Sequence, residues 1–254
     1  MVQTKIALVT GGGRGLGKDM ALKIAKKGID VIVTYNSNKN AAEEVVNLIK
    51  AIGQKAIAIQ LNVEYSSSFA SFLAELQSSL QTTFITDKID YLINNGGFGL
   101  DSSSFESTTE EQFDRLMNVH FKGVFFLTQH LLPILNNGGS IVNISSAVTR
   151  VSFPGRGAYA SIKAAVETLT VNLAKELGSR NIRANVVAPG AIATDFGGGR
   201  TRDNLHIQEY LKSQTAIPRI GQADDIGGVV AFLCSEEAKW ITGQRIEVSG
   251  GFML

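Results

Sequence analysis

The sequence predicts an α/β fold in which helices cover both faces of a doubly wound, seven-stranded parallel sheet. Short β-branched runs alternate with amphipathic helical stretches along almost the whole chain. The first run leads into a glycine-rich loop that opens a helix, and no linker or internal repeat divides the 254 residues. We therefore expect a single domain, 1–254.

Each strand is expected at a short apolar run with little polar alternation, which is typical of parallel strands buried on both faces. The seven runs are IALVT (6–10), DVIVTY (30–35), AIAIQL (56–61), DYLINN (90–95), SIVNIS (140–145), IRANVVA (182–188) and RIEVS (245–249). Gly28, Gly53 and Gly178 stand where left-handed residues end the intervening helices. Right-handed crossovers in such a Rossmann-like sheet bring the functional loops to the carboxyl ends of the strands.

Charge and composition exclude several classes of function. Lys and Arg total 24 against 23 Asp and Glu, a net charge of +1 without any block of like charge, so we expect a small-molecule partner and neither nucleic acid nor a membrane surface. Cys234 is the one cysteine, and three scattered histidines lack metal-ligand spacing, so neither a disulfide nor a metal is expected. Since no apolar stretch suits a signal peptide or a membrane span, we expect a cytoplasmic protein.

The glycine-rich loop is TGGGRGLG, residues 10–17. Glycines let backbone N–H groups approach a pyrophosphate, and the following helix adds its partial positive charge. The loop departs from G-x-G-x-x-G, because Leu16 stands where the third glycine would be, and Lys18 with Asp19 does not make a Walker motif. A phosphate-binding loop is the favoured interpretation, and a plain tight turn is the alternative.

A tyrosine, a lysine and a serine indicate the chemistry. Tyr159 and Lys163 are four residues apart in a stretch with helical spacing, 158–177, so their side chains share one face. The pair alone is a weak signal. Ser146 strengthens it, because this serine directly follows a predicted strand and precedes the helix that carries Tyr159.

These three groups suit the interconversion of a ketone and a secondary alcohol. Hydride transfer to a ketone leaves an alkoxide that needs a proton, and a phenol with an ordinary pKa of about 10 is a poor base at neutral pH. We expect the Lys163 ammonium, together with the positive nicotinamide of an oxidised cofactor, to lower the pKa of Tyr159. Ser146 is expected to hydrogen-bond the substrate oxygen.

From Lys5 to Gly251 the sequence resembles the short-chain dehydrogenase/reductase family, and within it the β-ketoacyl carrier-protein reductases and related ketoreductases. The resemblance rests on TGGGRGLG, Asn94-Asn95-Gly96-Gly97, Asn118 in MNVHFKG, Ser146, YASIK (159–163), Pro189-Gly190 with Thr194, and ITGQRIEVSGG near the end of the chain. Two positions depart from the family pattern. Gly96 stands where alanine is usual, and Asn62 stands where aspartate is usual; the Asn62 oxygen still accepts a hydrogen bond, although without charge assistance.

The resemblance implies a cofactor half of about 1–145 and a half of about 146–254 that carries the catalytic helix, the substrate loop and the last strand. It implies that Asn118 anchors a water chain to Lys163, which restores the proton on Tyr159. It also implies a homotetramer with the apolar end of the chain, 252–254, buried between subunits. The expected cofactor contacts are Gly11, Arg14, Gly15, Leu16, Gly17, Asn36, Ser37, Asn62, Val63, Asn94, Gly96, Tyr159, Lys163, Pro189, Gly190, Ile192 and Thr194.

The end of the second predicted strand indicates which cofactor binds. NAD-preferring proteins carry an acid there that accepts from the ribose hydroxyl and would repel a 2′-phosphate. This chain has no acid between Asp30 and Glu43, while Asn36 and Ser37 are neutral donors and Arg14 can reach the phosphate. NADP(H) is therefore favoured over NAD(H), and a solvated loop arginine is the alternative for Arg14.

Other interpretations stay open. The segment 196–204, FGGGRTRDN, reads either as a mobile lid over the substrate or as a plain flexible loop, and Arg200 or Arg202 could meet an anionic substrate. His120 reads as a packed or hydrogen-bonded histidine. The substrate pocket is expected to be mostly apolar, edged by Gly97, Phe98, Val148, Phe153, Ile192 and Phe196. The leading function is an NADP(H)-dependent carbonyl reductase, and the alternative is a cofactor-binding regulatory or scaffold protein without turnover.

Overall fold

The computed structural model describes residues 4–99 and 104–254 and contains one seven-stranded sheet, in which every neighbouring pair of strands is parallel. The strand order is β3-β2-β1-β4-β5-β6-β7. The strands are β1 (Ile6–Val9), β2 (Asp30–Tyr35), β3 (Ala56–Gln60), β4 (Ile89–Asn94), β5 (Leu135–Ile144), β6 (Arg183–Pro189) and β7 (Arg245–Val248). The predicted fold class and all seven predicted strands are confirmed.

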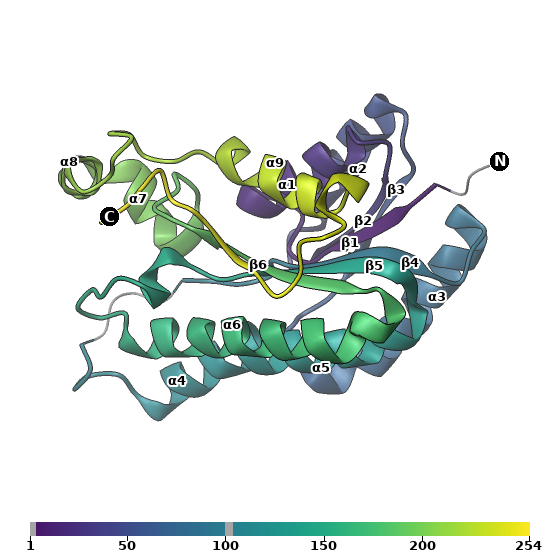
Figure 1. Ribbon diagram of the computed structural model, residues 1–254, viewed down its shortest axis with the longest axis horizontal. Helices are drawn as coiled ribbons and strands as arrows, with labels where there is room; N and C mark the ends of the chain where they lie inside the picture. The colour runs from purple at the N-terminus through teal and green to yellow at the C-terminus, as the bar shows by residue number, and fades with distance from the viewer. Residues whose placement is uncertain (1–3, 100–103) are drawn as a thin grey trace.

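Helices cover both faces of this sheet, as Figure 1 shows: α1, α2 and α9 lie on one face, and α3, α4, α5 and α6 on the other. The helices are α1 (Gly15–Ala25), α2 (Lys39–Ile52), α3 (Phe69–Ser79), α4 (Glu110–Met117), α5 (Gly123–Leu131), α6 (Gly157–Leu177), α7 (Arg200–Asp203), α8 (Leu205–Ser213) and α9 (Asp224–Leu233). In the part of the chain that the structure describes, no helix is both long and apolar enough to cross a membrane.

Two large apolar clusters of the described residues lie one on each face of the sheet, and a third, small cluster surrounds Phe252. Val9 and Val33 belong to the cluster beneath α1, α2 and α9, whereas their neighbours Leu8 and Ile32 belong to the cluster beneath α3, α5 and α6. All four side chains are fully buried. This two-sided burial explains why the strands read as continuous apolar runs instead of alternating ones.

The ends of two elements differ from the sequence-based expectation. Gly53 ends α2 in a left-handed conformation with φ of 100°, as expected, but Gly178 is helical with φ of −57°. The chain continues through a 3₁₀ turn and reverses at Asn181, whose φ is 54°, because asparagine tolerates this region better than other residues with a Cβ. β5 begins earlier than predicted, since Asn136 bonds Asp90 at the start of β4 and so extends the pairing.

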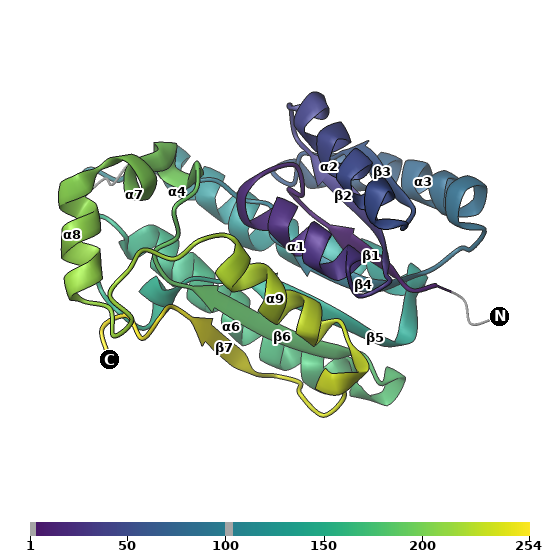
Figure 2. The same ribbon diagram turned by 90° about the horizontal axis from the view of Figure 1, so that it is seen from above.

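The strand order reverses between β1 and β4, and this is where a doubly wound sheet opens a ligand crevice. The chain runs outward from β1 to β2 and β3, and then returns to β4 on the other side of β1. Figure 2 shows α7 and α8 beyond the carboxyl ends of β6 and β7, at the same end of the molecule. The glycine-rich loop and the loops after β4, β5 and β6 therefore meet at one edge of the sheet.

Candidate active site

The glycine-rich loop is joined to the loop after β4 by the Thr10 hydroxyl. Thr10 Oγ1 accepts from the backbone N–H of Asn95 at 2.9 Å and of Gly96 at 2.8 Å. In return, the Asn95 side-chain amide donates to the carbonyl oxygens of Thr10 (2.9 Å) and Gly11 (3.3 Å). These bonds fix the geometry of the crevice at the point where the strand order reverses.

The glycines of this loop are required by close contacts of the backbone. A Cβ built on Gly17 would lie 2.2 Å from the Gly11 carbonyl oxygen, well inside contact distance, and Gly11 has φ of +64°. Arg14 precedes α1 in an extended conformation and gives the helix no side-chain cap, so the first N–H groups stay available to an anion. The loop thus has the shape and the donors that a dinucleotide pyrophosphate needs.

Two of the residues expected at the cofactor's ribose phosphate, Asn36 and Ser37, directly follow β2. Gly12 N–H donates to Thr34 O at 3.0 Å, which ties the loop to β2, and Asn36 and Ser37 follow as exposed residues. The side chain of Arg14 is 75% exposed and lies 3.7 Å from Asp195. Both interpretations of Arg14, phosphate ligand or solvated loop residue, are compatible with this placement.

Two expected cofactor residues use their side chains elsewhere. The Asn94 amide is buried in the sheet and donates to Asn143 (2.8 Å) and Thr128 (3.0 Å), whereas the neighbouring Asn95 faces the glycine-rich loop. The Asn62 oxygen accepts from Glu64 N–H at 3.0 Å and so caps its own turn. Periodicity could have distinguished the two asparagines at the end of β4, because consecutive strand residues point to opposite faces.

The other expected cofactor residues lie at the same edge of the sheet. Gly96 contacts Val63, since a Cβ on Gly96 would be 3.6 Å from that side chain and 3.3 Å from Thr10 Oγ1. An alanine methyl here would be tightly placed, which suits the glycine that departs from the family pattern. A Cβ on Gly15 would be 3.7 Å from Thr194, so the loops after β1 and β6 meet. Pro189, Gly190 and Ile192 end β6 and lead into that loop.

The residues expected to be catalytic come from three neighbouring elements. Ser146 follows β5 and caps a short 3₁₀ turn, while Tyr159 and Lys163 lie one turn apart at the start of α6. The Lys163 Nζ donates to Ile144 O at 2.8 Å and lies 5.8 Å from the centre of the Tyr159 ring. Asn118 opens a π-turn between α4 and α5, a local irregularity that is frequent at functional sites.

The pKa of Tyr159 in the chain by itself depends on burial and on two neighbouring residues. Burial raises it to about 12, although Arg156 and a hydrogen bond to Ser146 act in the opposite direction. The Lys163 ammonium is bonded to a carbonyl oxygen instead, and burial lowers its own pKa to about 8. In the chain by itself, the phenol is therefore protonated at neutral pH, which is the form that can donate a proton to an alkoxide.

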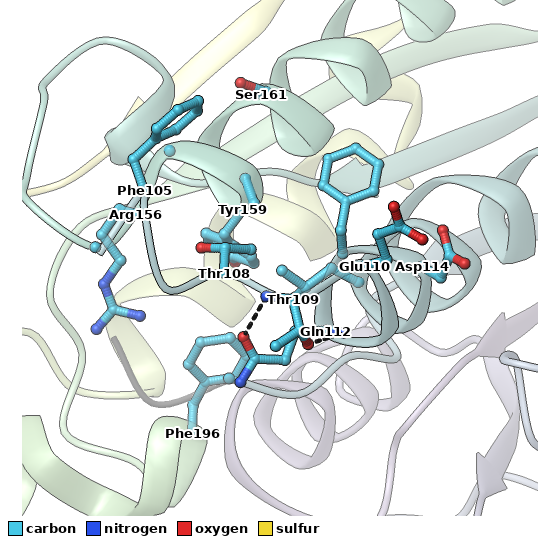
Figure 3. A pocket seen from close by; sticks show the side chains of 16 residues that line it. Phe105, Thr108, Thr109, Glu110, Gln112, Asp114, Arg156, Tyr159, Ser161 and Phe196 are labelled. Carbon is cyan, nitrogen blue, oxygen red and sulfur yellow. Dashed lines mark hydrogen bonds between the residues drawn. The ribbon is translucent and has the colours of Figure 1, made fainter. Parts of the chain in front are cut away.

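A cavity of about 500 Å³ opens beside Tyr159. Figure 3 shows its lining side chains, which come from the segment before α4, from α4, from the start of α6 and from Phe196. The capping box of Thr109 and Gln112 fixes where α4 begins and hence this wall. Of the expected pocket edge only Phe196 lines this cavity, whereas Phe153 stacks on Phe252 with ring centres 5.8 Å apart.

The segment 196–204 is a folded turn followed by the short helix α7. Gly197, Gly198 and Gly199 all have positive φ, so the three glycines build the turn instead of leaving an irregular loop. The turn places the Phe196 ring 6.1 Å from that of Tyr159. Arg202 forms ion pairs with Asp195 and Asp203, which leaves Arg200 as the better candidate for an anionic substrate.

Comparisons with known proteins agree with the family resemblance and with the fold. Residues 11–253 match the family model described as enoyl-(acyl carrier protein) reductase. The chain is 38% identical to a 3-oxoacyl-[acyl-carrier-protein] reductase, FabG, of Staphylococcus aureus, with all of both chains covered. It superimposes with a TM-score of 0.93 on the reductase LugOII, which catalyses keto-reduction at C1 during lugdunomycin biosynthesis (36% identity, 100% of each chain). It superimposes equally well on the angucycline C-6 ketoreductase LanV with bound NADP (34% identity, 99% of this chain and 96% of the other).

Proposed function

This chain belongs to the short-chain dehydrogenase/reductase family, and we propose that it reduces a ketone, ketoester or ketoacyl group to a secondary alcohol with NADPH. The observation that carries this proposal is the hydrogen bond between Ser146 and Tyr159, with Lys163 Nζ 5.8 Å from the Tyr159 ring, at the edge of the sheet that also carries the glycine-rich loop. When bound, the cofactor supplies the hydride.

The residues of this chain then handle the substrate oxygen. Ser146 donates a hydrogen bond that holds the carbonyl oxygen near Tyr159, and the protonated Tyr159 phenol delivers its proton to that oxygen as negative charge develops. The buried Lys163 ammonium holds its place through Ile144 O and favours the phenolate left behind. Asn118, at the π-turn, anchors the water chain through which the proton on Tyr159 is restored.

The cofactor is held by the loops that this structure joins. The N–H groups of 11–17 bind the pyrophosphate, Arg14 and Ser37 bind the 2′-phosphate, and Ile192 with Thr194 contacts the nicotinamide half. The neutral residues after β2 favour NADPH, because an acid at this place would repel the phosphate.

The substrate lies in the cavity beside Tyr159. The volume of this cavity, about 500 Å³, is within the range of small-molecule sites, and Phe105, Phe113 and Phe196 provide aromatic walls. Relatives of this chain are named for the reduction of 3-oxoacyl carrier-protein thioesters and of angucycline ketones, and both types enter the proposal as candidate substrates.

We also propose that the enzyme is a cytoplasmic homotetramer. Exposed apolar side chains on α5 and α6, among them Phe125, Phe126 and Val171, provide surface for subunit contacts. The end of the chain offers less surface for burial between subunits than the sequence suggests. Phe252 is already buried within its own chain, and of the last three residues only Leu254 is fully exposed. Light scattering at micromolar concentration should give a tetramer mass, and a monomer mass would exclude this assembly.

Loss of NADPH absorbance with a panel of aryl ketones, ketoesters and 3-oxoacyl thioesters tests the proposed function. Steady turnover with at least one of them is expected. The regulatory alternative would show NADPH binding by fluorescence titration with no turnover of any carbonyl compound.

A further inference from the structure

A row of side chains in contact runs from the protein surface to the Tyr159 ring, and His120 is the member that touches Tyr159. The Tyr159 and His120 rings form a T-shaped contact, with centres 5.2 Å apart and planes at 87°. On its other side His120 stacks on Phe98, at 5.4 Å and 30°, and the Arg115 guanidinium lies 4.4 Å above the Phe98 ring. His120 itself is 1% exposed.

The hydrogen bond of His120 fixes its tautomer. Nε2 lies 2.8 Å from the Phe98 carbonyl oxygen, and since a carbonyl oxygen can only accept, Nε2 carries the hydrogen. Burial, together with the nearby Lys163 charge, holds the pKa of His120 well below its ordinary value, so the ring is neutral. His120 thus acts as a donor to the loop after β4 and not as an acid or a base.

The loop after β4 is shaped around this ring. A Cβ on Gly97 would lie 2.7 Å from His120 Cε1, so His120 occupies the space that any other residue at 97 would need. The same short loop is bonded at Gly96 to Thr10 in the glycine-rich loop, and at Gly99 it lines the cavity. The His120 bond to Phe98 therefore lies between the cofactor loop and the substrate cavity.

The other ring nitrogen of His120, Nδ1, is energetically unfavourable in this arrangement. Nδ1 is buried and has no hydrogen-bond partner among the described residues, which is unfavourable for a polar atom. An apolar ring would fill the same space without that cost. The donor at Nε2 is what histidine adds here, and it acts on the loop beside the reacting groups.

We infer that His120 is a positioning residue for the proposed ketone reduction. Its ring supports Tyr159 at the angle from which the proton is delivered, and its Nε2–H holds the 97–98 segment against the substrate. This role rests on the proposed function and adds to it a residue that acts through Tyr159 and through the loop after β4.

Two substitutions separate the two contacts of His120. His120→Phe keeps a ring against Tyr159 but removes the donor to Phe98, so we expect KM for the ketone to rise at least fivefold with a smaller change in kcat. His120→Gln keeps an N–H donor but removes the ring, so we expect kcat to fall by about 10- to 100-fold, since misplacement by about 1 Å can cost this much. The Kd of NADPH should stay within twofold of the wild-type value in both variants.

His130 on α5 provides a matched control. Its Nδ1 lies 2.8 Å from the Phe126 carbonyl oxygen, and its ring meets the edge of Phe69 at 6.0 Å and 81°. These are the same two kinds of contact, but away from the site. His130→Phe and His130→Gln should leave kcat and KM unchanged.

A spectroscopic titration tests the same inference without turnover. The tyrosinate absorbance of Tyr159 is isolated by subtracting the curve of the Tyr159→Phe variant. His120→Gln should lower the pKa of Tyr159 from about 12 towards 10, because a smaller polar side chain admits water beside the phenol, and His130→Gln should not.

The inference is overturned if both His120 variants keep wild-type kcat and KM, or if the titration curve of Tyr159 does not move. It is also overturned if both variants lose NADPH binding as much as turnover, because the role would then be structural only. A wild-type enzyme that turns over no ketone would refute the proposed function instead, and the titration would still decide whether His120 supports Tyr159.

Discussion

The hydroxyl of Thr10 joins two of the loops that form the site. It is fully buried, and it links the glycine-rich loop to the loop after β4 through Asn95 and Gly96. Thr10→Val keeps the shape of the side chain and removes only the hydroxyl. The variant therefore measures what this link contributes to stability and to cofactor binding.

The structure sets the expected size of the effect. Gly96 N–H is partly buried and loses its acceptor, and a donor left without either a partner or water costs about 1–3 kcal/mol. Asn95 N–H keeps a second acceptor, Ile93 O at 3.1 Å, so its loss is limited to about 0.5–1.5 kcal/mol. Together the free energy of unfolding should fall by about 1.5–4.5 kcal/mol, a large part of the 5–15 kcal/mol typical of folded proteins.

Urea unfolding at a fixed protein concentration, with NADPH titration in parallel, provides the assay. Thr10→Ser retains the hydroxyl and loses one methyl group, so its loss should stay near 1 kcal/mol. Thr10→Val should also weaken NADPH binding, because the loop that carries Gly96 is released from the glycine-rich loop. Equal stability of the two variants would refute the argument that this hydroxyl holds the loops together.

Three further predictions concern the cofactor and the pH dependence of stability. Ser37→Asp or Arg14→Ala should reduce or reverse the preference for NADPH in kcat/KM, and a preference that neither change moves would count against the phosphate site. Gly17→Ala should abolish NADPH binding in a fluorescence titration, since its methyl group would lie 2.2 Å from the Gly11 carbonyl oxygen. Wild-type affinity would contradict the proposal that the glycine-rich loop binds the pyrophosphate. Arg150 holds the pKa of Glu247 at about 2, below its ordinary 4.5, so the stability this pair provides is present above pH 4.5 and is lost as pH falls towards 2; the melting temperature of Glu247→Gln should depend less on pH across that window than that of the wild type.

Local patterns in the sequence predicted much of the fold. The apolar runs predicted all seven strands, because a parallel strand covered on both faces has no polar alternation to confuse the assignment. The sequence could not show that β5 starts at Leu135, since this depends on the bond between Asn136 and Asp90, two residues far apart in the chain. Gly178 was misplaced as a helix end for a related reason: glycine permits a left-handed turn but does not impose one.

The site was predictable to the extent that its residues recur in family motifs. Ser146, Tyr159 and Lys163 come together as expected. The pKa of Tyr159 could not be foreseen, because it depends on burial and on where the Lys163 ammonium points. The contact of His120 with Tyr159 could not be predicted either, since it requires the π-turn after α4, the helix α6 and the loop at Gly97 to pack together.

The delivery of a proton by Tyr159 is the central claim, and Tyr159→Phe tests it most directly. The substitution removes the phenolic hydroxyl and leaves the ring against His120 and Phe196. With a ketone that the wild type reduces, NADPH oxidation should fall by about 10²- to 10⁴-fold, the usual contribution of a general acid, while the Kd of NADPH stays within twofold. A Tyr159→Phe enzyme that binds NADPH normally and reduces the same ketone at the wild-type kcat would contradict the account.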